Sequence, residues 1–224
     1  FSIAKCLAVS LPKNDIILTN KNKHLREKYS NTFHVIEENN VSAVNQATII
    51  CIFTRPEQVE SLLEEIQPHL TSDKLIVNFS AKKLTLEKPL INVASSPVVE
   101  EKIFALFYEQ NSFVTEEMLQ IFKNFLSNRT TFFSKCNNAL EELKIMSRVY
   151  THNITYFQQL LNKGYNSERL RIYFQLATET IKLSDLDKAQ QKAKTKDGLT
   201  ENLLNYYHKN FLEFIEAEEK AMNK

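Results

Sequence analysis

Short apolar runs alternate with segments of helical spacing through the first half of the chain. The apolar runs predict β-strands at residues 15–19, 33–36, 47–53, 74–79 and 89–94. The helical spacing predicts helices at residues 3–10, 23–30, 40–46 and 57–70. This alternation predicts βαβ units, and therefore an α/β fold with a Rossmann-type, doubly wound parallel sheet.

The second half of the chain has helical spacing only. It predicts helices at residues 115–127, 138–161, 167–183 and 199–222. Long helices with apolar residues on more than one face tend to pack against a second subunit. We therefore expect an NAD(P)-type nucleotide-binding domain at residues 1–125 and an all-helical dimerisation domain at residues 126–224, with a homodimer formed through the C-terminal helices.

Charge and cysteine content argue against several kinds of partner. The chain has 28 basic and 27 acidic residues with a net charge of +1, and no basic block marks a nucleic-acid site. It contains neither a run long enough to span a membrane nor a secretory signal, so we expect no membrane partner. The three cysteines lie far apart and lack metal-ligand spacing, which indicates no metal site and a reducing, cytoplasmic location.

Glycine is scarce in this sequence. Gly164 and Gly198 are the only glycines in 224 residues, whereas loops that bring the backbone close to phosphates normally contain several. The sequence begins at Phe1 rather than at a methionine. If the chain binds a dinucleotide, we therefore expect the first strand and the glycine loop to lie upstream of Phe1.

Several segments together resemble one known family. Residues 47–56, Ala-Thr-Ile-Ile-Cys-Ile-Phe-Thr-Arg-Pro, resemble the pattern A-D-V-I-x-L-A-V-K-P of the pyrroline-5-carboxylate reductases, and residues 57–70 resemble the helix that follows it. Residues 73–81 are similar to the family's D-K-L-I-V-S-I-A-A, and residues 194–200 lie where the family has the turn T-S-P-G-G-T-T. Order and spacing agree over nearly the whole chain, which thus resembles a diverged member of the family.

The resemblance implies a cofactor domain followed by helices that interlock with those of a partner. The family's active site lies between the cofactor domain of one subunit and the dimer helices. Its reaction transfers hydride from a nicotinamide to the C=N carbon of pyrroline-5-carboxylate, a small-molecule substrate, and yields proline. The cofactor carries the hydride chemistry, and the protein contributes orientation and electrostatics.

The resemblance also assigns roles to individual residues. Ser2 falls on the last glycine of the family's glycine fingerprint, and Asn40 matches an asparagine that contacts the cofactor. Thr200 is the candidate catalytic residue, because the resemblance implies that its hydroxyl contacts a substrate nitrogen. The alternative is an N-terminal cap of the helix that follows. The cofactor loop beside the nicotinamide ribose corresponds to Phe53, Thr54, Arg55 and Pro56.

The turn after the second strand of a dinucleotide domain selects the cofactor. An acidic residue there binds the ribose hydroxyls of NAD, whereas basic residues accommodate the 2′-phosphate of NADP. The residues at this turn are Thr19, Asn20, Lys21 and Lys23. They include two cations and no acid, so NADP(H) is favoured over NAD(H). The alternative is an ordinary surface turn with solvated lysines.

The sequence departs from the family where the substrate binds. Residues 78–82 replace the S-x-A-A-G turn, with a lysine for the glycine, and residues 91–97 replace the R-x-M-P-N-T-P segment. The S-G-S-G-P stretch falls on residues 147–151, which contain no glycine. Because those glycines let the backbone approach a small carboxylate, we expect Arg148 and Tyr150 to fill that space.

Two functions of different classes remain open. One is a pyrroline-5-carboxylate reductase-like, NADP-dependent oxidoreductase that reduces an imine or related small substrate with altered specificity. The other is a catalytically inactive relative that acts as a dimeric binding or regulatory protein. A β-hydroxyacid reductase is a third alternative, although Arg148 stands where such an enzyme would need an asparagine after Lys144. His152, beside the expected substrate stretch, is a further candidate residue.

Overall fold

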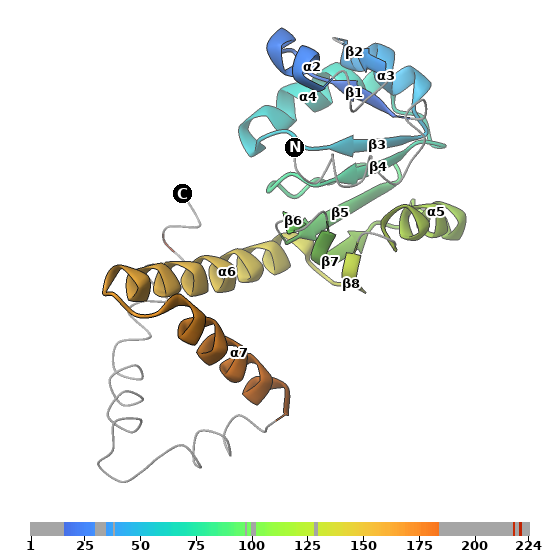
Figure 1. Cartoon of the computed structure of the whole chain (residues 1–224). Coiled ribbons are helices and arrows are strands. Elements are labelled where there is room, and N and C mark those ends of the chain that lie inside the picture. The colour runs from blue at the N-terminus through green and yellow to red at the C-terminus, as the bar shows by residue number, and fades with distance from the viewer. Residues whose placement is uncertain are drawn as a thin grey trace. The chain divides into compact units, whose positions relative to one another are not determined.

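The structure is a computed structural model that describes residues 16–29, 35–37, 39–96, 98–99, 102–127 and 130–183, together with residues 217 and 220. The chain divides into two compact units, Phe1–Met146 and Ser147–Lys224. Every described strand lies in the first unit, whereas the second contains helices (Figure 1). None of the helices within the described ranges is both long and apolar enough to cross a membrane.

Two short strands form a parallel pair near the start of the first unit. β1 (Ile17–Thr19) pairs with β2 (Val35–Glu37), and α2 (Lys23–Tyr29) connects them. α3 (Asn40–Gln46) follows β2 and packs against both strands. Asn39 begins α3, because its side-chain oxygen accepts hydrogen bonds from the first free backbone N–H groups of the helix.

The larger sheet of the first unit is mixed. Its six strands are β3 (Ile49–Ile52), β4 (Leu75–Asn78), β5 (Leu90–Ser95), β6 (Val98–Val99), β7 (Lys102–Gln110) and β8 (Thr130–Lys135). β3, β4 and β5 run parallel, β7 is antiparallel to β5 and β6, and β8 is parallel to β7. The α/β, Rossmann-like class is confirmed, but the prediction of a wholly parallel sheet is wrong. A parallel crossover needs about a dozen residues or more, and the segment between β5 and β7 is too short for one.

Helices cover both faces of the larger sheet (Figure 1). α4 (Val59–Ile66), between the short 3-10 helices η2 (Pro56–Gln58) and η3 (Gln67–His69), lies on one face, and α5 (Glu116–Ser127) lies on the other. The buried core on the α4 side comprises Val44, Ile52, Val59, Ile66, Leu70, Ile76, Leu84 and Leu90. The buried core on the α5 side comprises Leu75, Val77, Ile91, Val93, Ile103, Leu106, Tyr108, Val114, Leu119, Phe122 and Leu126. Helices on both faces explain the continuous apolar runs at residues 49–53 and 75–77.

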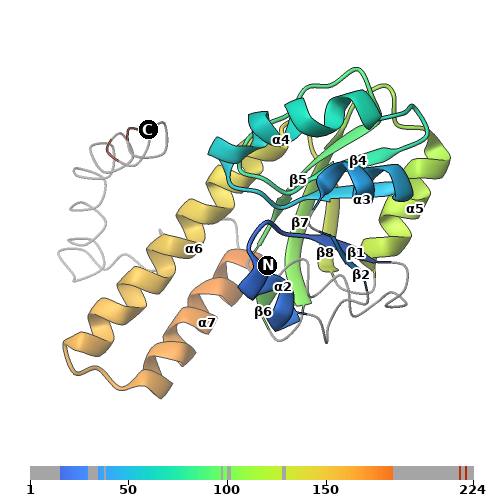
Figure 2. The same cartoon turned by 90° about the horizontal axis from the view of Figure 1, so that it is seen from above.

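Parallel pairing brings the carboxyl ends of β3 and β4 to one edge of the sheet (Figure 2). The register sets Ile52 opposite Asn78, so the loops that follow the two strands start side by side. The candidate site described below is built on these loops.

Two long helices follow the sheet. α6 (Ala139–Asn162) begins in the first unit and continues into the second, and α7 (Ser167–Leu183) follows it. Gly164 ends α6 with φ of 86°, a left-handed conformation that glycine adopts without strain. The first unit ends at Met146 rather than at the expected residue 125, because β8 pairs with β7 inside it.

Most predicted elements are present within one to three residues of their expected bounds. The strands β6, β7 and β8 were not predicted. The helix expected at residues 3–10 lies outside the described residues, as does the one at 199–222 except for Ala217 and Lys220, which are helical.

Candidate functional site

The loops that follow β3 and β4 are tied together at the carboxyl end of the sheet. The backbone N–H of Phe79 donates to the carbonyl oxygen of Ile52 at 2.9 Å, which continues the strand pairing by one step. The rings of Phe53 and Phe79 stack, with centroids 4.6 Å apart and an interplanar angle of 18°. In open α/β sheets, ligands bind beyond the carboxyl ends of the strands. These two loops therefore form the candidate site.

Two hydroxyl groups in these loops are buried. The Oγ1 of Thr54 and the Oγ of Ser80 have no hydrogen-bond partner among the described residues. Ser80 is only 7% exposed. The sequence indicates Thr54 as a cofactor residue, whereas it gives Ser80 only as part of the altered turn at residues 78–82.

The remaining residues of the predicted cofactor loop have different surroundings. Arg55 has an 82% exposed side chain, and its Nη1 lies 4.0 Å from the Oε1 of Glu57. Pro56 is the first residue of η2, a position that suits its fixed φ. Phe53 and Thr54 thus lie at the sheet end of the loop, whereas Arg55 projects into solvent.

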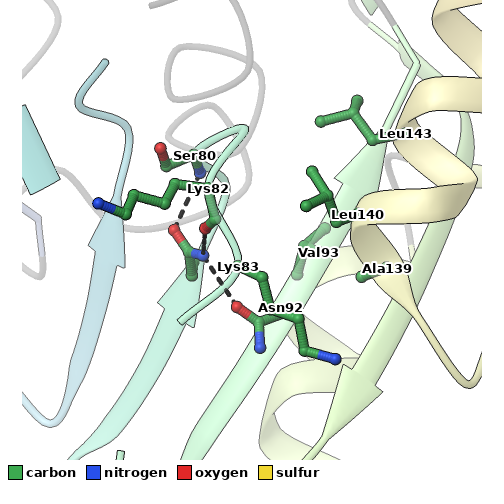
Figure 3. A pocket seen from close by; sticks show the side chains of 9 residues that line it. Ser80, Lys82, Lys83, Asn92, Val93, Ala139, Leu140 and Leu143 are labelled. Carbon is green, nitrogen blue, oxygen red and sulfur yellow. Dashed lines mark hydrogen bonds between the residues drawn. The ribbon is translucent and has the colours of Figure 1, made fainter. Parts of the chain in front are cut away.

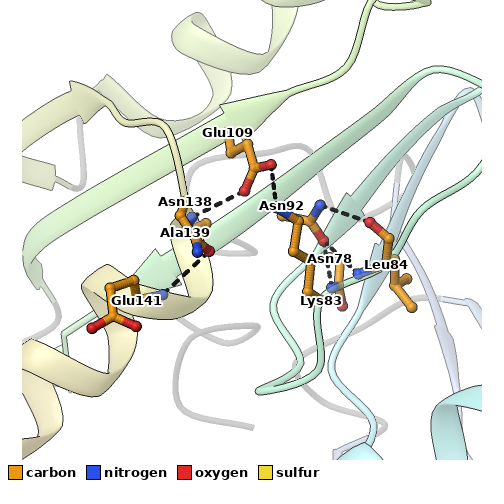
Figure 4. A network of polar contacts seen from close by, with 8 residues as sticks. All are labelled: Asn78, Lys83, Leu84, Asn92, Glu109, Asn138, Ala139 and Glu141. Carbon is orange, nitrogen blue, oxygen red and sulfur yellow. Dashed lines mark hydrogen bonds and ion pairs between the residues drawn. The ribbon is translucent and has the colours of Figure 1, made fainter.

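A pair of buried asparagines lies behind the loop after β4 (Figure 4). The Nδ2 of Asn78 donates to the Oδ1 of Asn92 at 2.9 Å and to the carbonyl oxygen of Lys82 at 2.7 Å. Asn92 binds both backbone groups of Leu84, accepting from its N–H at 3.1 Å and donating to its carbonyl oxygen at 3.0 Å. The Oδ1 of Asn78 accepts from the N–H of Ser80 at 3.0 Å. Because buried polar atoms require partners, these bonds fix the path of the loop.

One carboxylate joins this loop to the start of α6 (Figure 4). The Nζ of Lys83 lies 2.6 Å from the Oε1 of Glu109, and the Oε2 of Glu109 accepts from the N–H of Ala139 at 3.1 Å. A carboxylate is favourable there, because the first N–H groups of a helix lack partners within it. A cavity of about 10 Å³ lies between the loop and Leu140 and Leu143 of α6 (Figure 3). That volume corresponds to roughly one water molecule.

Lys82 replaces the glycine of the family turn and is paired within the first unit. Its ammonium group contacts the carboxylate of Glu60 in α4. The hydrogen bond from Lys82, reinforced by its charge, lowers the pKa of the Glu60 carboxyl below its ordinary value. Figure 3 shows the Lys82 side chain turned away from Leu140 and Leu143. The lysine therefore ties the loop after β4 to α4.

The turn after β1 carries the residues expected to select the cofactor. Thr19 ends the strand, and the Nη1 of Arg26 donates to the carbonyl oxygens of Asn20 at 2.6 Å and Lys21 at 3.0 Å. The Oδ1 of Asn20 accepts from the N–H of Asn22 at 2.8 Å. These bonds hold the backbone of the turn and leave the Lys21 side chain 82% exposed.

Glu65 brings two of the predicted cofactor residues together. The Nδ2 of Asn40 donates to its Oε2 at 3.1 Å, and the Nζ of Lys21 lies 3.8 Å from the same oxygen. Lys23 instead pairs with Glu27 in α2, at 4.0 Å. Glu65 lies 25 positions from Asn40 in the sequence and has no motif of its own, so sequence reasoning missed it.

The other candidates lie apart from these loops or outside the described residues. Ser2 and Thr200 lie outside the described residues. Tyr150, expected to fill space left by glycine, lies on α6 and is 47% exposed. Burial raises the pKa of the Cys51 thiol in β3 to about 12 and also raises that of Cys136, so both thiols are neutral near pH 7.

Parallel strands with polar loops at their carboxyl ends define a Rossmann-like domain of the nucleotide-binding class. Residues 1–82 match a family described as NADP oxidoreductase, coenzyme F420-dependent. No curated protein matches the sequence. The chain therefore has a fold like that of NAD(P)-dependent reductases.

Solved structures identify the kind of reductase that this fold resembles. Pyrroline carboxylate reductase from Plasmodium falciparum, solved with NADP bound, superposes with a TM-score of 0.76 at 15% identity, over 98% of this chain and 90% of that one. The 1-pyrroline-5-carboxylate reductase of Streptococcus pyogenes gives 0.72 at 10% identity, over 100% and 92%. An imine reductase from Pseudomonas sp. gives 0.61 at 13% identity, over 86% and 72%. The resemblance to pyrroline-5-carboxylate reductases is confirmed at the level of the fold.

Proposed function

We propose that this protein is an NADP(H)-dependent reductase that acts on the C=N bond of a small imine, with specificity altered from pyrroline-5-carboxylate. The observation that carries the proposal is a fold common to pyrroline-5-carboxylate reductases and imine reductases. The polar loops at the carboxyl ends of β3 and β4 lie where this fold takes its cofactor. NADPH supplies the hydride, and the chain binds and orients the reactants.

The turn after β1 supports NADP(H) over NAD(H). Lys21 and Lys23 are more than four-fifths exposed and lie at the outer limit of ion pairing with their carboxylates. Exposed pairs of this kind contribute little stability, about 0–1 kcal/mol. The ammonium groups therefore exchange these partners readily for a 2′-phosphate, which carries more charge and more acceptor oxygens.

Glu65 is expected to oppose NADPH binding, because its carboxylate lies beside Lys21. Glu65→Gln keeps the side-chain shape and removes the charge, so we expect NADPH affinity to rise about three- to fivefold with NADH affinity unchanged. Fluorescence titration of both cofactors measures this. Glu64→Gln, an exposed neighbour on α4, is the matched control. An equal change for both cofactors would contradict a role for Glu65 at the 2′-phosphate.

The departures around the substrate support altered specificity. Lys82 and the buried Asn78–Asn92 pair occupy segments that differ from the family patterns. Thr200, which lies outside the described residues, is proposed to present its hydroxyl to the substrate nitrogen. The cofactor loop keeps a cation at Arg55 and the proline at Pro56, whereas the substrate segments have lost their glycines, so cofactor use is expected to persist.

A screen of NADPH oxidation tests the proposed reaction. The full-length protein is incubated with pyrroline-5-carboxylate and with cyclic imines that lack the carboxylate, and absorbance at the reduced nicotinamide band is followed. We expect turnover of at least one imine and slow or no turnover of pyrroline-5-carboxylate. Cofactor binding without turnover of any imine would favour the second candidate, a catalytically inactive dimeric binding protein, which the changed substrate segments also support.

A homodimer through α6 and α7 is part of the proposal. Between residues 147 and 162, Arg148 is the only Lys, Arg, Asp or Glu, so two copies of this surface would meet without strong like-charge repulsion. Large apolar side chains between 44% and 63% exposed on or between these helices are Ile145, Val149, Tyr150, Ile154, Tyr156, Tyr165, Ile172, Tyr173 and Leu176. Large exposed apolar side chains gathered on two successive helices support an interface on these helices.

Light scattering tests the dimer directly. We expect a mass of two chains for the wild type and of one chain for the variant Ile154→Asp with Leu176→Asp, because each change buries a carboxylate in the interface. Gln159→Asp, on an exposed position of the same hairpin, is the charge-matched control and should stay dimeric. A wild-type mass of one chain would rule out this interface.

A further inference from the structure

Arg26 on α2 binds three successive carbonyl groups of the turn after β1. Its Nη1 donates to the carbonyl oxygen of Asn20 at 2.6 Å and to that of Lys21 at 3.0 Å. Its backbone N–H donates to the carbonyl oxygen of Asn22 at 3.1 Å, within the start of the helix. The side chain and the backbone of one partly buried residue thus hold the whole turn.

These contacts fix the backbone on both sides of Lys21. A peptide unit is planar and rotates as one body, so a bound carbonyl oxygen sets the orientation of the whole unit. The two units that flank Lys21 carry the carbonyl oxygens of Asn20 and Lys21, and Arg26 binds both. The backbone dihedral angles of Lys21, and with them the direction of its side chain, are therefore determined by the arginine.

The ammonium group of Lys21 is not held in a comparable way. Its Nζ lies 3.8 Å from the Oε2 of Glu65, and the side chain is 82% exposed. An exposed pair at that distance restrains a long side chain weakly. The direction of Lys21 thus comes from its backbone. Arg26 also directs the carbonyl oxygens toward itself, and their partial negative charges would otherwise oppose an anion at the turn.

We infer that Arg26 is a positioning residue for NADP(H) selection, which acts by directing Lys21 toward the 2′-phosphate of the cofactor. The arginine lies on the helix after the turn, and the sequence resemblance assigns no role to it. A charged donor suits this task, because its hydrogen bonds to carbonyl oxygens are stronger than those of a neutral donor. The inference rests on the proposed use of NADPH.

Two substitutions of Arg26 separate its hydrogen bonds from its other properties. Arg26→Ala should weaken NADPH binding about fivefold, because Lys21 is then no longer directed to the phosphate. NADH lacks that phosphate, so its affinity should stay within about twofold. Arg26→Lys keeps one charged nitrogen that can donate to both carbonyl oxygens, and should restore NADPH affinity to within about twofold of the wild type. Fluorescence titration of the full-length protein measures all four values.

A double-mutant cycle with Lys21→Ala shows whether Arg26 acts through the lysine. Lys21→Ala alone should weaken NADPH binding about fivefold. Adding Arg26→Ala should weaken it further by less than about twofold, because no ammonium group remains to be directed. Lys28→Ala, which removes a positive charge from the same helix, is the control and should bind NADPH as the wild type does.

Each outcome of the titrations decides a different statement. Selective loss of NADPH affinity in Arg26→Ala, restoration by Arg26→Lys and a non-additive cycle support the positioning role. If the two losses multiply to about 25-fold, Arg26 contacts the phosphate itself and the inference is overturned. Equal loss of NADPH and NADH affinity also overturns it, because the arginine would then maintain the turn as a whole.

The wild type provides the remaining distinction. If it binds NADPH and Arg26→Ala binds it equally well, this inference alone is overturned. If the wild type binds no NADPH, the proposed function is overturned together with the inference.

Discussion

Asn92→Ala is expected to lower the free energy of unfolding by about 3 kcal/mol, because it leaves two buried backbone groups without partners. Asn92 is 7% exposed, and its amide binds both the N–H and the carbonyl oxygen of Leu84, which is itself 5% exposed. Asn78 would also lose one of its two acceptors. Urea denaturation followed by circular dichroism measures the change.

Asn124→Ala is the matched control for this measurement. Asn124 lies on the exposed surface of α5, where it accepts a hydrogen bond from Gln120 at 2.9 Å. Its replacement should change the free energy of unfolding by no more than about 0.5 kcal/mol. If Asn92→Ala lowers the free energy of unfolding by no more than Asn124→Ala does, that result would contradict the view that the asparagine pair holds the loop after β4.

The double variant Lys21→Ala with Lys23→Ala is expected to bind NADPH about 30-fold more weakly, because each cation loses a charge-assisted hydrogen bond to the 2′-phosphate. NADH lacks that phosphate, so its affinity should stay within about twofold. Fluorescence titration of each cofactor gives both values. The double variant is thus expected to lose most of its preference for NADPH over NADH.

Lys28→Ala provides the control, because it removes a charge near the end of the same helix without approaching the turn after β1. Its NADPH affinity should match that of the wild type. If NADPH and NADH affinities fall together in the double variant, the lysines act through the shape of the turn rather than through the 2′-phosphate. If neither falls, NADP(H) selection lies elsewhere in the chain.

Local sequence pattern predicts the elements that are covered by helices on both faces. Residues 49–53 and 75–77 are continuously apolar, and they lie in or directly after β3 and β4 of the larger sheet. β7 contains a continuous apolar run at residues 103–108 and is therefore visible in the local pattern, whereas β8 was missed for a different reason. β8 has no strong apolar pattern, and it exists as a strand because β7 offers it a free edge. Whether such a segment forms a strand depends on pairing with a segment that is distant in the sequence. A short stretch of local sequence gives no information about that pairing.

Some residues of the candidate site were likewise predicted from the sequence, whereas others were found only in the structure. The loop at residues 53–56 was found through the family resemblance, whereas the burial of the Ser80 hydroxyl is visible only in the structure. Glu65 and Asn92 were missed because their partners lie 25 and 14 positions away. Lys82 was recognised as a substitution for glycine, but its pairing with Glu60 depends on how α4 packs on the sheet.

Titration of the full-length protein with NADPH and NADH tests the central claim most directly. The proposed reductase requires saturable NADPH binding in the micromolar range, with NADH at least about tenfold weaker. Fluorescence of the reduced nicotinamide reports binding at the end of the cofactor that reacts. Absence of binding at millimolar concentrations of both cofactors would contradict the account, and would leave a protein that keeps the reductase fold without its chemistry.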